Sequence, residues 1–129
     1  MTENEISRII YDAAIEVHRT LGGAGLLESI YEEALAYELC SKGLDVKRQL
    51  EVPVFYIGVK LENKFRIDLL INEKVIIECK ATSEYNNIFE VQTMTYLRLT
   101  GLKLGMVINF GEPMVRNGIH RVVNNLDED

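Results

Sequence analysis

The sequence predicts a single α/β domain in which a mixed sheet is flanked by helices. The chain has 129 residues, 47% of them hydrophobic and 26% charged, which is typical of one folded globular domain. Apolar residues recur at helical spacing up to residue 44, and the pattern then changes to alternation from residue 46. We expect one domain over residues 1–126, followed by a short acidic tail over residues 127–129.

Two helices are expected before residue 44. Thr2 and Glu5 have the spacing of an N-terminal capping box, and apolar residues then recur at helical intervals until the Gly-Gly pair at 22–23. A second helix is expected to begin near Gly25 and to end at Gly43, because glycine is a common residue just after a helix. The apolar face expected of this second helix consists of Leu27, Ile30, Ala34, Leu35 and Leu39.

The remaining chain alternates between strand and helix patterns. Strands are expected over residues 46–56, 65–71 and 75–79, a third helix over 87–100, a strand over 104–109 and a short edge strand over 119–123. The order is therefore α-α-β-β-β-α-β with one further strand. Because hairpins and helices both occur, we expect parallel and antiparallel pairs in one sheet.

The loop between the second and third strands decides which side chains face each other. A three-residue loop over 72–74 keeps one face of this pair apolar, whereas a two-residue loop would set Ile71 against Lys74. Lys74 is the least typical residue of the longer loop, since such loops favour Gly or Asn in a left-handed position. The pairs expected from the longer loop are Ile71 with Val75, Leu69 with Ile77, and Ile67 with Cys79.

The same register gathers four charged residues on the opposite face. It sets Asp68 opposite Glu78 and Arg66 opposite Lys80, with opposed Cβ atoms about 5 Å apart. Two carboxylates this close repel each other. Either the two basic residues neutralise them as a charge ladder, or the carboxylates hold a divalent cation, since Mg²⁺ favours carboxylate oxygens. The pattern alone leaves both interpretations open.

Asp68, Glu78 and Lys80 form the arrangement D-x9-E-x-K, which resembles the motif of the PD-(D/E)XK nuclease superfamily. That resemblance implies a restriction-endonuclease-like core of order αβββαβ, which matches the expected order from the second helix onward, with one extra N-terminal helix. A second motif, G-x-x-E-x-x-Y over residues 25–31, makes the chain similar over nearly its whole length to the small GxxExxY family within that superfamily. Ile67 stands where the superfamily name has proline.

The resemblance implies a nuclease that uses Mg²⁺ or Mn²⁺ to hydrolyse phosphodiester bonds. Asp68, Glu78 and Glu28 would be its metal ligands, and Lys80 would position the attacking water and stabilise charge on the phosphate. Gln92 on the third helix would orient water or substrate. The plainer interpretations stay open. Lys80 would simply neutralise Glu78, Glu28 would be an acid stabilised by the helix dipole in the first turn, and Gln92 would be an ordinary polar residue.

Tyr31, His18 and Arg66 are the substrate-binding candidates that accompany this resemblance. Each also has a structural interpretation. Tyr31 would be a packing residue with a hydrogen-bonded hydroxyl, His18 a structural residue near the end of the first helix, and Arg66 a member of the charge ladder.

Charge leaves a nucleic-acid partner possible and does not support it, so the expected partner follows from the resemblance. The net charge of −6 argues against a protein that coats nucleic acid non-specifically, although a bound cation would make the region around the acids more positive. We expect nucleic acid as the partner, with DNA favoured over RNA. A homodimer is possible, because cutting both strands of a nucleic-acid duplex needs two active sites. Phe55 and Ile57 would either form the dimer contact or belong to the core.

The alternative function is a catalytically inactive nuclease-fold module that binds nucleic acid or a protein partner. The chain has no signal-peptide pattern and no run near the roughly 20 apolar residues of a membrane span, so we expect a cytoplasmic protein with no membrane association.

Overall fold

The computed structural model describes residues 1–127 and places one mixed sheet between helices. Its elements are α1 (Glu3–Thr20), α2 (Glu28–Ser41), β1 (Val46–Tyr56), β2 (Val59–Ile71), β3 (Val75–Lys80), α3 (Ile88–Thr100), β4 (Leu104–Asn109), the 3-10 helix η1 (Val115–Gly118) and β5 (Ile119–Val123). The strands lie in chain order, and only β3 and β4 are parallel, joined through α3. The predicted α/β fold with a mixed sheet is confirmed. The last two residues of the predicted tail lie outside the described chain.

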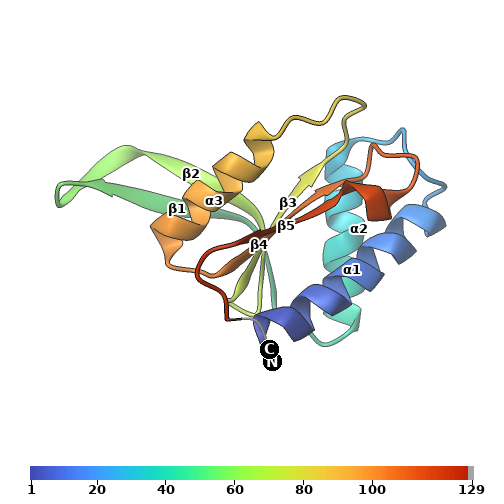
Figure 1. Cartoon of the computed structure of the whole chain (residues 1–129), viewed down its shortest axis with the longest axis horizontal. Coiled ribbons are helices and arrows are strands. Elements are labelled where there is room, and N and C mark those ends of the chain that lie inside the picture. The colour runs from blue at the N-terminus through green and yellow to red at the C-terminus, as the bar shows by residue number, and fades with distance from the viewer. Residues whose placement is uncertain (128–129) are drawn as a thin grey trace.

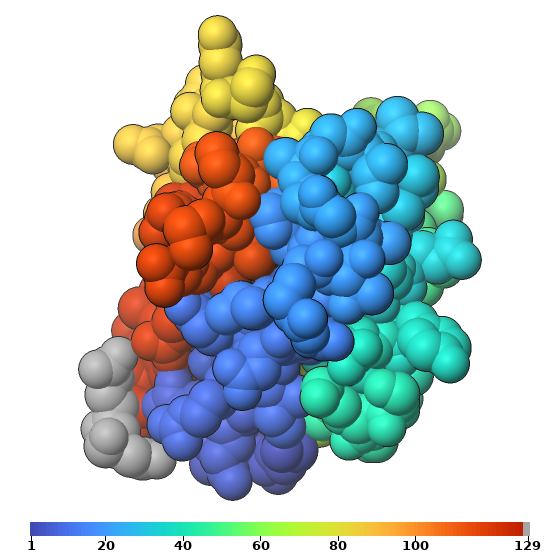
Figure 2. Space-filling view, turned by 90° about the vertical axis from the view of Figure 1, so that its right-hand side faces the viewer, coloured from blue at the N-terminus to red at the C-terminus, as the bar shows by residue number. Residues whose placement is uncertain are grey.

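The sheet is covered unequally on its two faces. Helices α1 and α2 lie on one side and α3 on the other, while the β1–β2 ribbon extends away from the rest of the molecule (Figure 1). When the molecule is viewed from the side of these two helices, α1 lies between the segment that contains η1 and α2 (Figure 2). The larger core cluster joins α1 and α2 to the sheet, and the smaller one, under α3, comprises Ile67, Leu70, Ile76, Leu97 and Val122.

The first helix begins as its sequence predicts. Thr2 Oγ1 accepts a hydrogen bond from the Glu5 N–H at 3.1 Å, and Glu5 Oε1 accepts one from the Thr2 N–H at 2.9 Å, so the capping box is confirmed. The helix ends at Thr20, just before Gly22 and Gly23, which adopt φ angles of 91° and 97°. Such left-handed angles suit glycine, which has no Cβ.

The predicted apolar face of the second helix is partly wrong. Leu27 precedes α2 and is 70% exposed, and Ile30 is 41% exposed. The helix is rotated so that Tyr31 points inward instead of Ile30, because the Tyr31 hydroxyl is bonded to the glycine-rich loop before the helix. The buried residues of α2 are Tyr31, Glu32, Leu35, Ala36 and Leu39.

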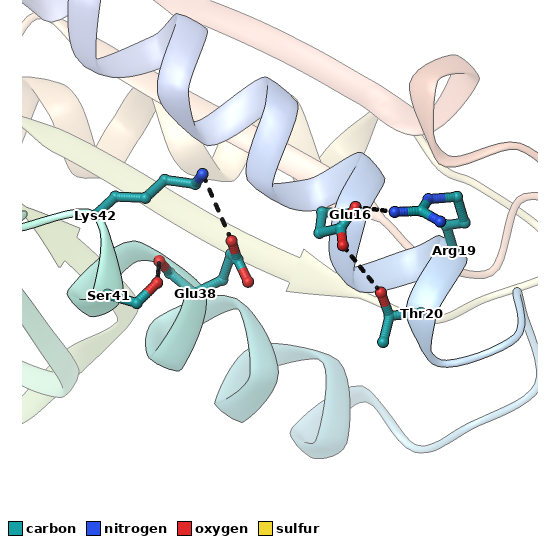
Figure 3. Close-up of polar contacts among 6 residues, drawn as sticks. All are labelled: Glu16, Arg19, Thr20, Glu38, Ser41 and Lys42. Atoms are coloured by element: carbon teal, nitrogen blue, oxygen red, sulfur yellow. Dashed lines mark hydrogen bonds and ion pairs between the residues drawn. The ribbon is translucent and has the colours of Figure 1, made fainter.

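Ion pairs on the outer surface of this layer are local to each helix. Glu16 contacts Arg19 and Thr20 within α1, and Glu38 lies 3.6 Å from the Lys42 Nζ at the end of α2 (Figure 3). Exposed pairs of this kind contribute little to stability. The two helices are therefore held together chiefly by their apolar contacts with each other and with the sheet.

The β2–β3 register is confirmed at its closed end and corrected at its open end. Ile71 pairs with Val75 and Leu69 with Ile77, across a three-residue loop. The left-handed residues of that loop are Asn72 and Glu73, at φ 50° and 57°, and not Lys74.

Beyond the Leu69–Ile77 pair the ladder stops, so the predicted pairing of Ile67 with Cys79 is wrong. Ile67 packs in the cluster under α3, whereas Cys79 packs against α1 and α2. The physical reason is that side-chain oxygens, described below, take the place of backbone carbonyls between these two strands.

No helix within residues 1–127 combines the length and apolar character needed to cross a membrane.

Candidate active site

The carboxylates of Asp68 and Glu78 lie where β2 and β3 separate, a place called here the fork. The backbone N–H of Asp68 donates to Glu78 Oε2 at 2.9 Å, and the backbone N–H of Cys79 donates to Asp68 Oδ2 at 2.9 Å. Each acid is thus anchored to the backbone of the opposite strand. The structure brings the two carboxylates together as the register suggested, through these bonds and not through a continued ladder.

Glu78 is buried in an environment that disfavours its charge. Its exposure is 6%. Burial raises the pKa of Glu78 to about 8, and the negative charge of Asp68 adds to this effect; the bond from the Asp68 N–H and the charge of Lys80 oppose it. Perturbation by burial and a charged neighbour is characteristic of functional sites. At neutral pH, burial and the neighbouring charge of Asp68 therefore favour the protonated form of Glu78.

Lys80 follows Glu78 by two residues and lies against α3. Its Nζ is 4.6 Å from the centre of the Phe89 ring, a distance typical of a cation–π contact. Its charge acts on both Glu78 and Glu28, since it lowers the pKa of each against the larger effect of burial. Lys80 is therefore the basic side chain that the structure brings to the fork.

Arg66 does not complete the predicted charge ladder. Its guanidinium lies 4.0 Å from Glu51 Oε1, and the two residues are paired across β1 and β2. The ladder of four charges is therefore wrong, because β2 and β3 have already separated at this point. A contact of Arg66 with substrate stays a prediction.

Two acids of α2 approach the fork from the helical layer. Glu28 is the first residue of α2. Although Glu28 is exposed, partial desolvation raises its pKa despite the opposing charge of Lys80, and the charges of Asp68 and Glu32 add to the rise. Glu32, one turn later, is 5% exposed, and its pKa is raised by burial and by the charge of Asp68. The charge of Asp68 thus acts on three carboxyl groups whose pKa values are raised.

Glu32 and Gln49 are site residues that the sequence interpretation missed. Glu32 Oε1 accepts a hydrogen bond from Gln49 Nε2 at 2.7 Å, and Glu32 Oε2 accepts one from Arg48 at 3.3 Å. The available signal for Glu32 was an acid four residues after Glu28, on the same face of the helix and within its buried stripe. Gln49 gave no signal, because a glutamine at one position of an alternating strand is unremarkable.

Tyr31 and His18 lie in the interior on the other side of the helical layer. The Tyr31 hydroxyl donates to the Gly23 carbonyl at 2.6 Å and accepts from the Leu26 N–H at 3.1 Å, and its ring stacks on Phe110 at 4.8 Å. His18 Nε2 is 3.1 Å from the Phe110 carbonyl oxygen. The structural interpretation of both residues is confirmed, and a substrate contact for either stays a prediction.

Gln92 is exposed on α3, and its side chain makes no hydrogen bond with any described residue. Tyr96, one turn later, stacks on Phe65 at 4.5 Å. Its pKa is raised by burial and, to a smaller extent, by the charges of Glu78 and Asp68, which places this part of α3 within electrostatic reach of the fork. A role for Gln92 toward water or substrate stays a prediction.

The donor chemistry of the fork fits a hard divalent cation. Within residues 1–127, no three His, Cys, Asp or Glu side chains form a ready-made metal cluster. Asp68 and Glu78 each use one oxygen for a backbone bond, which leaves Asp68 Oδ1 and Glu78 Oε1 as candidate ligands. One or two carboxylates are the usual protein share of a Mg²⁺ site, because this ion keeps several waters. Glu28 as a third ligand stays a prediction.

Comparison with known proteins agrees with the geometry. The model of the PD-(D/E)XK nuclease superfamily matches residues 4–122, a span that contains the fork, the flanking helices and nearly all of β5. Neither a curated protein nor a solved structure matches the chain. Because the matched span includes almost every element of the fold, the chain belongs to the PD-(D/E)XK nuclease superfamily.

Proposed function

We propose that this protein is a Mg²⁺- or Mn²⁺-dependent nuclease that hydrolyses phosphodiester bonds in nucleic acid, with DNA favoured over RNA. One observation carries the proposal: two interlocked carboxylates, Asp68 and Glu78, lie beside Lys80 at a fork whose burial raises the pKa of Glu78 to about 8. Membership of a nuclease superfamily supports the same chemistry. The chain's resemblance to the GxxExxY family is part of this proposal.

Asp68 and Glu78 would hold the cation, with Glu28 as a further ligand. When bound, such an ion lowers the pKa of its water and stabilises negative charge on the phosphate. It would also offset the repulsion between the acids at the fork, which explains why these residues are kept together at the expense of stability.

The chain's own side chains orient the reaction. The backbone bonds from Cys79 and Asp68 fix the two carboxylates before any ligand arrives. Lys80 supplies a positive charge for the phosphate, and its contact with Phe89 restricts where the ammonium group lies. Gln92 would face substrate from α3.

A homodimer belongs to the proposal as well. Cutting both strands of a duplex needs two sites, and one domain supplies one fork. Phe55 is 62% exposed and Ile57 is 84% exposed, so both lie on the surface of the ribbon and neither belongs to the core. They offer an apolar surface to a second copy.

The decisive test compares cleavage by the wild type with cleavage by Asp68→Asn. Single- and double-stranded DNA and RNA are incubated with Mg²⁺, with Mn²⁺ or with EDTA. We expect metal-dependent cleavage that Asp68→Asn reduces to below about 1% of wild type, since a metal ion contributes several kcal/mol to such a reaction. Asp12→Asn, an exposed acid on α1, is the matched control and should cleave normally.

Two results would contradict the proposal. Undiminished cleavage by Asp68→Asn would place the active site elsewhere. Binding of nucleic acid without cleavage under any metal condition would favour the inactive module instead.

A further inference from the structure

A chain of hydrogen bonds reaches Asp68 from the side opposite to Glu78. Gln49 Nε2 lies 2.7 Å from Glu32 Oε1 and 3.4 Å from Asp68 Oδ1. Glu32 is in turn fixed by its bond with Arg48. One amide group of β1 therefore stands between a buried acid of α2 and the Asp68 oxygen that is not bonded to Cys79.

The backbone at Gln49 is distorted in a way that aims this amide. Its φ angle is 51°, within the left-handed region and inside a strand; such a conformation in a residue other than glycine costs about 1–3 kcal/mol. Residues four apart in a regular strand share a face. Val46, however, packs with the α1–α2 cluster and Leu50 with the cluster under α3. The strand thus changes faces around Gln49.

The partner strand changes faces at the same level. Leu69 packs with the α1–α2 cluster and Ile67 with the cluster under α3, so the change falls around Asp68. Irregularities that redirect a side chain are frequent beside active sites. Gln49 and Asp68 are therefore brought together where both strands depart from regular alternation.

A primary amide is chemically suited to this place. It offers two N–H donors, so it can serve two carboxylates at once. It carries no charge, so it holds the acids without cancelling the negative charge that a cation requires. A lysine or arginine at this position would neutralise the fork.

We propose that Gln49 and Glu32 are positioning residues that hold Asp68 Oδ1 in the orientation in which it binds the cation. This inference rests on the proposed function for its consequence, although the contact itself exists without metal. The competing view is that Gln49 serves only to bend β1.

Glycine substitution separates the two views. Gln49→Gly accepts the left-handed backbone and removes the amide. Glu73→Gly is the matched control, because Glu73 has a φ of 57° in the exposed β2–β3 loop. Mn²⁺ binding is measured by calorimetry without nucleic acid, and a cooperative thermal transition in EDTA checks that each variant is folded.

We expect Gln49→Gly to weaken Mn²⁺ binding about 10- to 100-fold, the range found when groups that orient metal ligands are lost. Glu73→Gly should bind Mn²⁺ as the wild type does. Unchanged binding in Gln49→Gly, with normal binding by the wild type, would overturn the positioning role and leave the proposed function intact.

A measurement without metal distinguishes failure of the positioning contact from failure of the proposed function. In EDTA, the two side-chain N–H signals of Gln49 in a ¹⁵N–¹H spectrum should respond separately, one to Asp68→Asn and the other to Glu32→Gln. If neither signal moves, the positioning contact is overturned, whatever the protein does with metal. If both move but the wild type neither binds Mn²⁺ nor cleaves, the contact stands and the proposed function fails.

Discussion

Two polar clusters lie on either side of α2 and differ in how their polar groups are satisfied. In the cluster of Tyr31, His18 and Phe110, the polar side chains bond to backbone groups and the Tyr31 ring stacks on Phe110. At the fork, carboxyl groups crowd together, and the pKa values of Glu28, Glu32 and Glu78 are all raised, chiefly by burial. The first cluster contains no acid, whereas the second gathers four acids around the positive charges of Lys80 and Arg48.

The G-x-x-E-x-x-Y motif contributes to both clusters. Glu28 lies within electrostatic reach of the fork, since its charge raises the pKa of Glu78, whereas Tyr31 is buried and bonds the loop that contains Gly23. The motif therefore combines a residue that maintains the fold with one that carries charge to the site. The comparison teaches that crowding of ionisable groups, more than burial or hydrogen-bond satisfaction, separates structural polar residues from candidate functional ones, since no buried side-chain nitrogen or oxygen among the described residues lacks a partner.

The largest effect is expected in the cluster around Tyr31. Tyr31→Ala should lower the free energy of unfolding by about 3–5 kcal/mol, because it removes a fully buried aromatic ring. Tyr31→Phe should cost about 1–3 kcal/mol, since the Gly23 carbonyl and Leu26 N–H lose their partner. Urea unfolding measures both. A loss for Tyr31→Phe as large as that for Tyr31→Ala would show that the hydroxyl, and not the packing, dominates.

At the fork, replacing a buried polar side chain is expected to raise the free energy of unfolding instead of lowering it. The pKa of Glu78 is about 8 in the folded chain against a usual 4.5, so between these values the folded state keeps a proton that the unfolded state has released, and stability falls as pH rises. Glu78→Gln cannot ionise and should be more stable than wild type by roughly 4 kcal/mol at pH 9. This gain should disappear near pH 4.5.

Urea unfolding in EDTA at pH 4.5, 7 and 9 checks this prediction. Glu62→Gln, an exposed acid of the ribbon, is the control and should give no pH-dependent difference. A Glu78→Gln variant that is less stable than wild type at pH 9 would mean that the fork is satisfied without a cation, and the contrast between the clusters would fail.

The smallest effect is expected at the surface pair between Glu38 and Lys42 (Figure 3). Lys42→Met should change the free energy of unfolding by about 0.3–0.5 kcal/mol, the usual contribution of a pair one turn apart on an exposed helix. Thermal unfolding at low and high salt checks it. A difference above about 1 kcal/mol would exceed what exposed pairs contribute and would require that this pair helps to join the helices.

The sequence predicted most of the local structure because local structure follows local patterns. The capping box of Thr2 and Glu5, the strands at 104–109 and 119–123, and the pairing of Leu69 with Ile77 are all confirmed. Each depends on residues that are close in the chain or on the parity of one short loop.

The remaining features depend on contacts between distant segments. The rotation of α2 that buries Tyr31 in place of Ile30 follows from bonds to the preceding loop and from Phe110. The separation of β2 from β3 follows from two side chains that compete with backbone carbonyls. Periodicity assumes regular strands, so it could not reveal the distortion at Gln49 or the bond that joins it to Glu32.

The outer edge of the ribbon determines how another molecule could approach it. β1 is the first strand of the sheet, so one side of its backbone has no neighbouring strand within the described residues. Pro53 provides no N–H group there, and the register shifts between Pro53 and Phe55. Both irregularities discourage another strand from adding to the sheet. A molecule that meets this edge would therefore be recognised through the side chains of the ribbon tip, which keeps a long exposed hairpin from becoming a template for uncontrolled assembly.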